Sequence, residues 1–168
     1  MKKLILSLLF VSLPVLACDG GIPHGNSRNI SALSLDANDM TEQEFRSTLK
    51  DFEKFFGPSV DNEHKAELQV IGSWGSNTVN AYAERDDDAW LITIYGGLAR
   101  HPAITLDGLK ATLCHELGHH LGGYPKKSTN KWSSAEGQAD YFAMMKCLRH
   151  LWEKEDNIGI MSKKEVPA

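Results

Sequence analysis

The middle of the chain carries an apolar pattern typical of an amphipathic helix. After Thr41, bulky apolar residues recur at helical spacing at Phe45, Leu49, Phe52, Phe55 and Phe56. Thr41 with Glu44 three residues later has the form of a capping box, and Gly57 followed by Pro58 is a stop signal. We therefore expect a helix over residues 41–56 whose apolar face packs on a core.

Three short runs that follow have the composition of strands. They read AELQVIG, NTVNAYA and AWLITIYGG and span residues 66–72, 77–83 and 89–97. Turn-rich segments, SWGS and ERDDD, separate them, which predicts an antiparallel meander. In the last run Trp90 and Ile92 alternate with polar or smaller neighbours, so that one side of this strand should face the core.

Two more helices are expected over residues 105–123 and 133–155. Thr105 or Asp107 can cap the start of the first, and Ser133 lies where a cap for the second would be. Together these elements predict an α+β fold in which a small antiparallel sheet packs against the helices.

The length fits one folded domain over residues 40–155, followed by a polar, flexible tail over residues 156–168. The formal net charge is −4 at pH 7. An acidic chain lacks the electrostatic footprint of a nucleic-acid-binding protein, so we expect no nucleic-acid partner.

The N-terminus has the layout of a secretory signal over residues 1–17. Two lysines precede an apolar run that is too short to span a bilayer. The sequence VLAC before Asp19 resembles the lipobox of bacterial lipoproteins, which implies a lipid on Cys18, membrane contact through it and a cell-envelope or periplasmic location. Ordinary cleavage after Ala17 would instead leave Cys18 as a plain thiol. Residues 18–39 are rich in Gly, Asn and Ser and are expected to form a tether or loop.

The predicted helix over residues 105–123 contains the sequence HELGH at residues 115–119, whose side chains could bind a metal and transfer protons. Residues four apart lie on one helical face, so His115 and His119 can grip a single ion. Glu116 lies beside them, where it can take a proton from water at the metal. The motif therefore predicts a metal site, with zinc as the ion that suits this ligand set.

Catalytic zinc needs a third protein ligand. In the pattern H-E-x-x-H-x-x-G-x-x-H that ligand would fall at Pro125, and His120 points away from His119 around the helix, where we expect a surface or second-shell role. Glu136 in AEGQAD is the better candidate. Asp140 shares its face and could accept the outer N–H of a ligating histidine. The alternative role for Glu136 is a capping box with Ser133.

These residues resemble the gluzincins, zinc peptidases with H-E-x-x-H on one helix and E-x-x-x-D on the next. AEGQADYF is similar to a segment of the thermolysin-like enzymes, and the order of residues 80–119 is similar to the CaaX-prenyl-protease-like group. The resemblance implies a zincin-like fold, zinc on His115, His119 and Glu136, and Glu116 as the base that activates water. It also implies that residues 89–97 form a sheet edge that pairs with extended substrate.

An oxyanion-stabilising partner is implied as well, and this sequence offers Tyr124, Tyr141, Arg149 and His150.

The cysteines leave one pairing open. If Cys18 carries a lipid, Cys114 and Cys147 remain as a pair. With antiparallel helices and Glu136 opposite His119, however, the two cysteines would lie about 9 Å apart along the helix axis, more than a disulfide usually spans. This geometry disfavours the bridge, whereas helices that cross would shorten the distance and leave the pairing open.

The leading hypothesis is a zinc-dependent peptidase of the bacterial cell envelope that hydrolyses polypeptides, most simply an endopeptidase. The alternative is a metal-stabilised binding or assembly lipoprotein with little or no turnover. A third hypothesis is a latent peptidase whose metal is blocked by His24 or Cys18.

Overall fold

The computed structural model describes residues 28–87, 89–128 and 131–162. The predicted signal, Cys18 and His24 lie outside these ranges. The elements in chain order are α1 (Glu42–His64), β1 (Glu67–Ser73), β2 (Ala81–Asp86), β3 (Ala89–Tyr95), α2 (Gly96–Ala99), α3 (Leu106–Leu121), α4 (Glu136–Phe142), the π-helical segment η1 (Ala143–Cys147), α5 (Leu148–Leu151) and α6 (Asn157–Ser162). The predicted α+β class is confirmed.

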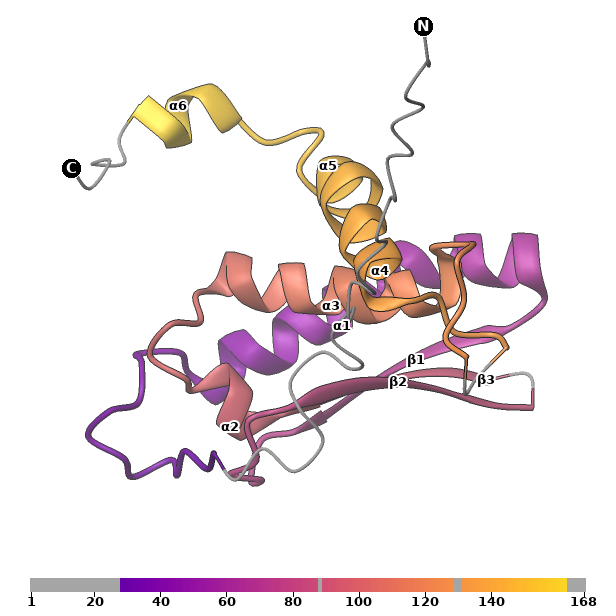
Figure 1. Ribbon diagram of the computed structural model, residues 1–168. Helices are drawn as coiled ribbons and strands as arrows, with labels where there is room; N and C mark the ends of the chain where they lie inside the picture. The colour runs from indigo at the N-terminus through magenta and orange to yellow at the C-terminus, as the bar shows by residue number, and fades with distance from the viewer. Residues whose placement is uncertain (1–27, 88, 129–130, 163–168) are drawn as a thin grey trace, which may run out of the picture.

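α1 and α3 lie side by side on one face of the three-stranded sheet (Figure 1). The core between these layers is apolar, and α1 and β3 contribute Phe45, Leu49, Phe52, Phe56, Val60, Trp90, Ile92 and Ile94 to it. Leu109, Leu113 and Leu117 of α3 complete it and are fully buried. Burial of these side chains is the main term that holds α3 on the sheet, at about 25 cal/mol for each Å² of apolar surface removed from water.

α1 begins as predicted and ends later than predicted. Thr41 and Glu44 form the reciprocal capping box. The helix then passes through Pro58 and ends at His64, and the capping residue Lys65 has a left-handed backbone with φ of 55°. The added residues bury Val60, and this gain outweighs the backbone hydrogen bond that Pro58 cannot donate. Phe55 is 44 % exposed, so it lies outside the predicted apolar face.

The predicted antiparallel meander is wrong in its strand order. The order is β1-β3-β2, with β1 parallel to β3 and β2 antiparallel to β3. β3 is therefore the central strand, and the expectation that residues 89–97 form an edge for substrate is wrong. The physical reason is that the most apolar of the three strands gains most from the centre, with neighbours on both sides.

The segment before α1 is attached to the domain where the structure describes it. Asn38 donates through its side-chain amide to the carbonyls of Ala99, His101 and Ile104. The buried Arg100 donates to the carbonyl of Ile30. Residues 28–39 are thus not a free tether. At the other end of the chain, residues 157–162 of the predicted flexible tail form the short helix α6, of which no residue is buried.

α4, η1 and α5 form one rod that rises steeply across α3 (Figure 1). At the crossing, a Cβ on Gly118 would lie 2.7 Å from the carbonyl oxygen of Ala139, so only glycine permits this approach. Cys114 and Cys147 are joined by a disulfide with a Cα–Cα distance of 5.6 Å. The expectation against this bridge is wrong, because it assumed antiparallel helices, whereas crossing helices bring the two cysteines together.

Candidate metal centre

α3 brings the two histidines of HELGH onto one face. The rings of His115 and His119 have centroids 4.8 Å apart and meet edge to face. Thr105 caps the start of this helix by accepting a hydrogen bond from the backbone N–H of Gly108. The predicted pairing of both histidines on one helical face is confirmed.

Glu136, the first residue of α4, adds a carboxylate to the pair. Its Oε2 lies 3.1 Å from Nε2 of His115 and 3.6 Å from Nε2 of His119. One ligand atom from each of the three residues lies within 4.8 Å of the others. The group could therefore hold a metal ion, and three protein ligands would leave a coordination position open for another molecule.

The capping-box alternative for Glu136 is wrong. Ala135, with extended backbone, is the residue before α4, and no side chain caps this helix. Ser133 instead directs its hydroxyl to the carbonyl of Ser134. Because α4 begins later than predicted, Ser133 is too far from the helix start to serve as its cap.

The outer ring nitrogens of both histidines have protein partners. Nδ1 of His115 donates to Oδ1 of Asp140 at 2.8 Å, and Nδ1 of His119 donates to the backbone carbonyl of Ser134 at 2.9 Å. These bonds fix the ring orientations and direct both Nε2 atoms to Glu136. The structure places Asp140 where the sequence predicted. The partner of His119 is a backbone group, which no side-chain pattern could have indicated.

Glu116 is the most buried carboxylate of the group, with 6 % of its surface exposed. Burial raises the pKa of its carboxyl to about 7; positive charge on His115 opposes this rise, and the negative charge of Glu136 adds to it. A cation beside Glu116 would lower that pKa again, because it favours the ionised form. A carboxyl balanced in this range can both accept and return a proton near neutral pH.

The two ligating histidines differ in their affinity for protons. Burial alone would lower the pKa of His115, but the hydrogen bond to Glu136 and the charges of Glu116 and Asp140 raise it to about 9. Burial lowers the pKa of His119. The hydrogen bond from His115 holds the pKa of the Glu136 carboxyl far below its usual range, against the effect of burial. A metal ion bound to Nε2 of His115 would therefore displace a proton from that ring.

Sequence reasoning missed Lys127. Its ammonium lies 2.5 Å from Oε1 of Glu136, whereas the contacts with the two histidines are made by Oε2. Lys127 belongs to the connection between α3 and α4, and KKSTNK gave no sign of which lysine would turn inward. A run of polar residues usually indicates a solvated loop, so only the tertiary structure reveals this contact.

His120 has a different role from the one predicted. It is 4 % exposed and lies stacked between Trp90 and Trp132, with ring centroids 5.0 and 4.9 Å away. Its Nε2 donates to the carbonyl of Leu91, and its Nδ1 accepts from Arg85. Burial lowers the pKa of His120 to about 3, so the ring is neutral. The surface expectation is wrong because the sheet and the connection cover this side of α3.

Of the four candidate oxyanion partners, Tyr124 and His150 have contacts with residues other than His115, His119 and Glu136. Tyr124 is largely exposed, and its ring contact is with Lys126. His150 packs against Phe55 and pairs with Glu153. Tyr141 and Arg149 are exposed on the rod formed by α4, η1 and α5, and both stay candidates.

Comparisons with family models, with curated proteins and with solved structures find no match to this chain. In the part of the chain that the structure describes, no helix combines the length and apolar content needed to cross a membrane.

Proposed function

We propose that this protein is a zinc-dependent peptidase of the bacterial cell envelope. The observation that carries the proposal is the convergence of Nε2 of His115, Nε2 of His119 and Oε2 of Glu136 beside the buried carboxyl of Glu116. Two imidazoles and one carboxylate form a ligand set that suits zinc and recurs in hydrolytic sites with an open position.

In the proposed mechanism, His115, His119 and Glu136 would hold the ion. Bound zinc acidifies water and polarises a carbonyl. Glu116 would accept the proton from the attacking water and deliver it to the leaving amine, because its buried carboxyl lies beside the ligand set and a bound cation would favour the ionised form that accepts a proton. Asp140 keeps the ring of His115 in place through its Nδ1–H, and the Ser134 carbonyl does the same for His119.

The proposed substrate is an extended polypeptide, and the outer edge of β2 is the surface that suits it. Of the two sheet edges, that of β1 is occupied in part, because Glu53 accepts the hydrogen bond of the Val70 N–H. Within the described residues, no strand pairs with the outer edge of β2. Arg85 of β2 contacts His120, so this strand lies beside the helix that also carries His115 and His119. Hydrogen bonds between the β2 backbone and the substrate backbone would not involve substrate side chains, so they would give weak sequence selectivity.

Export rests on the N-terminal signal pattern and the resemblance to a lipobox at Cys18. A lipid on Cys18 would hold the domain at the membrane. Mass spectrometry of the protein from a membrane fraction tests this part of the proposal: a diacylglyceryl mass on Cys18 supports it, and a free thiol contradicts it.

Metal analysis combined with casein cleavage tests the activity. The wild type should bind about one zinc per chain and cleave casein. Glu116→Gln should keep the zinc and lose cleavage, because the base is removed while the ligands remain. Glu136→Ala should lose both.

Glu63→Gln is the matched control, because it makes the same charge change at an exposed position on α1. It should behave like the wild type. Zinc binding without cleavage in the wild type would favour the metal-stabilised binding protein. Zinc binding unchanged in Glu136→Ala would remove Glu136 from the ligand set.

A further inference from the structure

The two oxygens of the Glu136 carboxylate have different partners. Oε2 faces Nε2 of His115 at 3.1 Å and Nε2 of His119 at 3.6 Å, whereas Oε1 lies 2.5 Å from Nζ of Lys127. A zinc-binding carboxylate can use one oxygen or both. With an ammonium on Oε1, only Oε2 is free to turn toward the histidines.

The main chain holds Lys127 in place. Its N–H donates to the carbonyl of Ser133 at 2.8 Å, and the N–H of Ala135 donates to the carbonyl of Pro125 at 2.8 Å. The N–H of Ser134 in turn donates to the carbonyl of His119 at 2.9 Å. These bonds tie the two limbs of the connection to each other and to the end of α3, so Lys127 is attached to the same helix that carries the histidines.

The ring of Trp132 anchors the connection a second time. It stacks on His120, which stacks on Trp90 of β3, and the carbonyl of Trp132 accepts a hydrogen bond from Lys126. The positions of Lys127 and of α3 are therefore coupled through side chains as well as backbone. A lysine held in this way loses less conformational freedom when it pairs with Glu136 than a lysine on an unattached loop would.

We propose that Lys127 is a positioning residue that keeps Glu136 a one-oxygen ligand, offering Oε2 to the metal and withholding Oε1. The inference rests on the metal site proposed above. It assigns Lys127 no contact with substrate. Its consequence is a metal with one open position that Glu136 cannot fill, where a substrate or water can bind.

Cobalt substitution tests the proposal without relying on activity. The full exported protein is loaded with Co²⁺, and its visible absorption spectrum is compared with those of Lys127→Met and Lys127→Arg. Met keeps the apolar stem and removes the charge, which frees Oε1. We expect Lys127→Met to lose visible intensity, because Co²⁺ with more than four ligands absorbs more weakly than tetrahedral Co²⁺, and Lys127→Arg to keep it.

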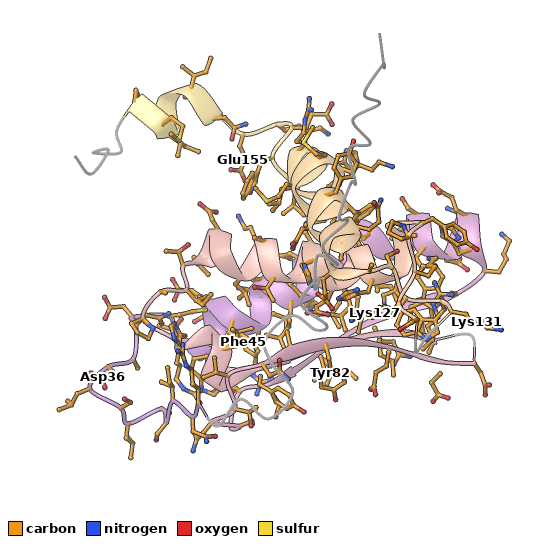
Figure 2. The ribbon with its side chains drawn as sticks, viewed as in Figure 1. Asp36, Phe45, Tyr82, Lys127, Lys131 and Glu155 are labelled. Carbon is orange, nitrogen blue, oxygen red and sulfur yellow. A yellow bond between two sulfur atoms is a disulfide. The ribbon has the colours of Figure 1, made fainter. Side chains whose placement is uncertain are left out.

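Lys131→Met is the matched control, because it removes the same charge from the same connection at an exposed position. Figure 2 labels both lysines, with Lys127 nearer the helices and Lys131 farther out along the connection. The control should have the wild-type spectrum. Circular dichroism shows whether each variant is folded, and Lys127→Gln replaces Lys127→Met if the latter is not.

The outcomes separate two failures. A wild type that binds no Co²⁺ would overturn the metal site and this inference together. A wild type that binds Co²⁺ with a spectrum identical to that of Lys127→Met would leave the metal site intact and overturn the role of Lys127. A spectrum that changes equally in Lys131→Met would also overturn it, since the effect would then be one of net charge.

Discussion

His119 and His120 are neighbours on α3 and are almost equally buried, with 5 % and 4 % of their surfaces exposed, yet the two faces of the helix use them differently. On the side of α4, His119 has one ring nitrogen on the Ser134 carbonyl and the other toward Glu136. On the side of the sheet, His120 has both nitrogens on protein partners and both ring faces on tryptophans.

This difference shows that residue type and burial alone do not decide whether a histidine can bind a metal. A metal needs a nitrogen whose lone pair is free, held in a fixed direction by a hydrogen bond to the other nitrogen. His119 meets this condition and His120 does not. The face toward α4 thus has a nitrogen that could bind a metal, and the face toward the sheet is used for packing.

The largest expected effect separates the two histidines directly. His119→Ala should weaken zinc binding by more than about 100-fold, since it removes a ligand and not merely an outer partner. His120→Phe should keep the zinc, because an aromatic ring preserves the stack, and should lower the free energy of unfolding by about 2 kcal/mol through two lost hydrogen bonds. Zinc competition with a chelator and urea unfolding measure the two quantities. Equal loss of zinc binding in His119→Ala and His120→Phe would contradict the different roles assigned to the two histidines.

The next effect concerns the covalent bond on the α4 side. The Cys114–Cys147 disulfide closes a loop with a sequence separation of 33. Replacing both cysteines by alanine should lower the free energy of unfolding by about 4 kcal/mol, because the unfolded chain gains entropy.

Denaturant unfolding with and without a reductant measures the contribution of the disulfide to the free energy of unfolding. The reductant should destabilise the wild type and leave the double variant unchanged. A double variant as stable as the oxidised wild type would show that packing at Gly118 alone holds the helices together.

The effect with the smallest step, about tenfold for each pH unit, is a pH dependence on the face of α3 toward α4. The pKa of His115 is raised to about 9, so below that pH a proton occupies the ring that zinc needs. The apparent zinc affinity should therefore rise about tenfold for each pH unit up to about pH 9, since one proton is displaced.

Calorimetry in buffers of different ionisation enthalpy counts the released proton. Asp140→Asn removes one of the charges that raise this pKa, so its pH dependence should shift to lower pH. A zinc affinity that is flat between about pH 6 and pH 9 would rule out the proton competition.

Local patterns predicted the elements that carry the chemistry. The capping box at Thr41, the cap at Thr105 and the four-residue spacing of His115 and His119 depend on residues near one another in the chain, and all three are present. Glu136 and Asp140 were also found from spacing, because side chains four apart share a helical face.

Long-range packing decided the rest. The place of β3 at the centre of the sheet depends on which strand buries most apolar surface between two neighbours. The turn sequences between the strands do not determine this order. The disulfide depends on the crossing angle, which a close contact between Gly118 and Ala139 permits. Both outcomes arise from surfaces that meet only after the chain has folded.

The sequence by itself determined that His115 and His119 share one helical face and that Glu136 and Asp140 share another, because helix periodicity is a local property. Only the tertiary structure decided that Lys127 would turn toward Glu136 while His120 turned into the core. The physical reason is that periodicity sets which side chains share a face, whereas the contacts of that face depend on elements far away in the chain.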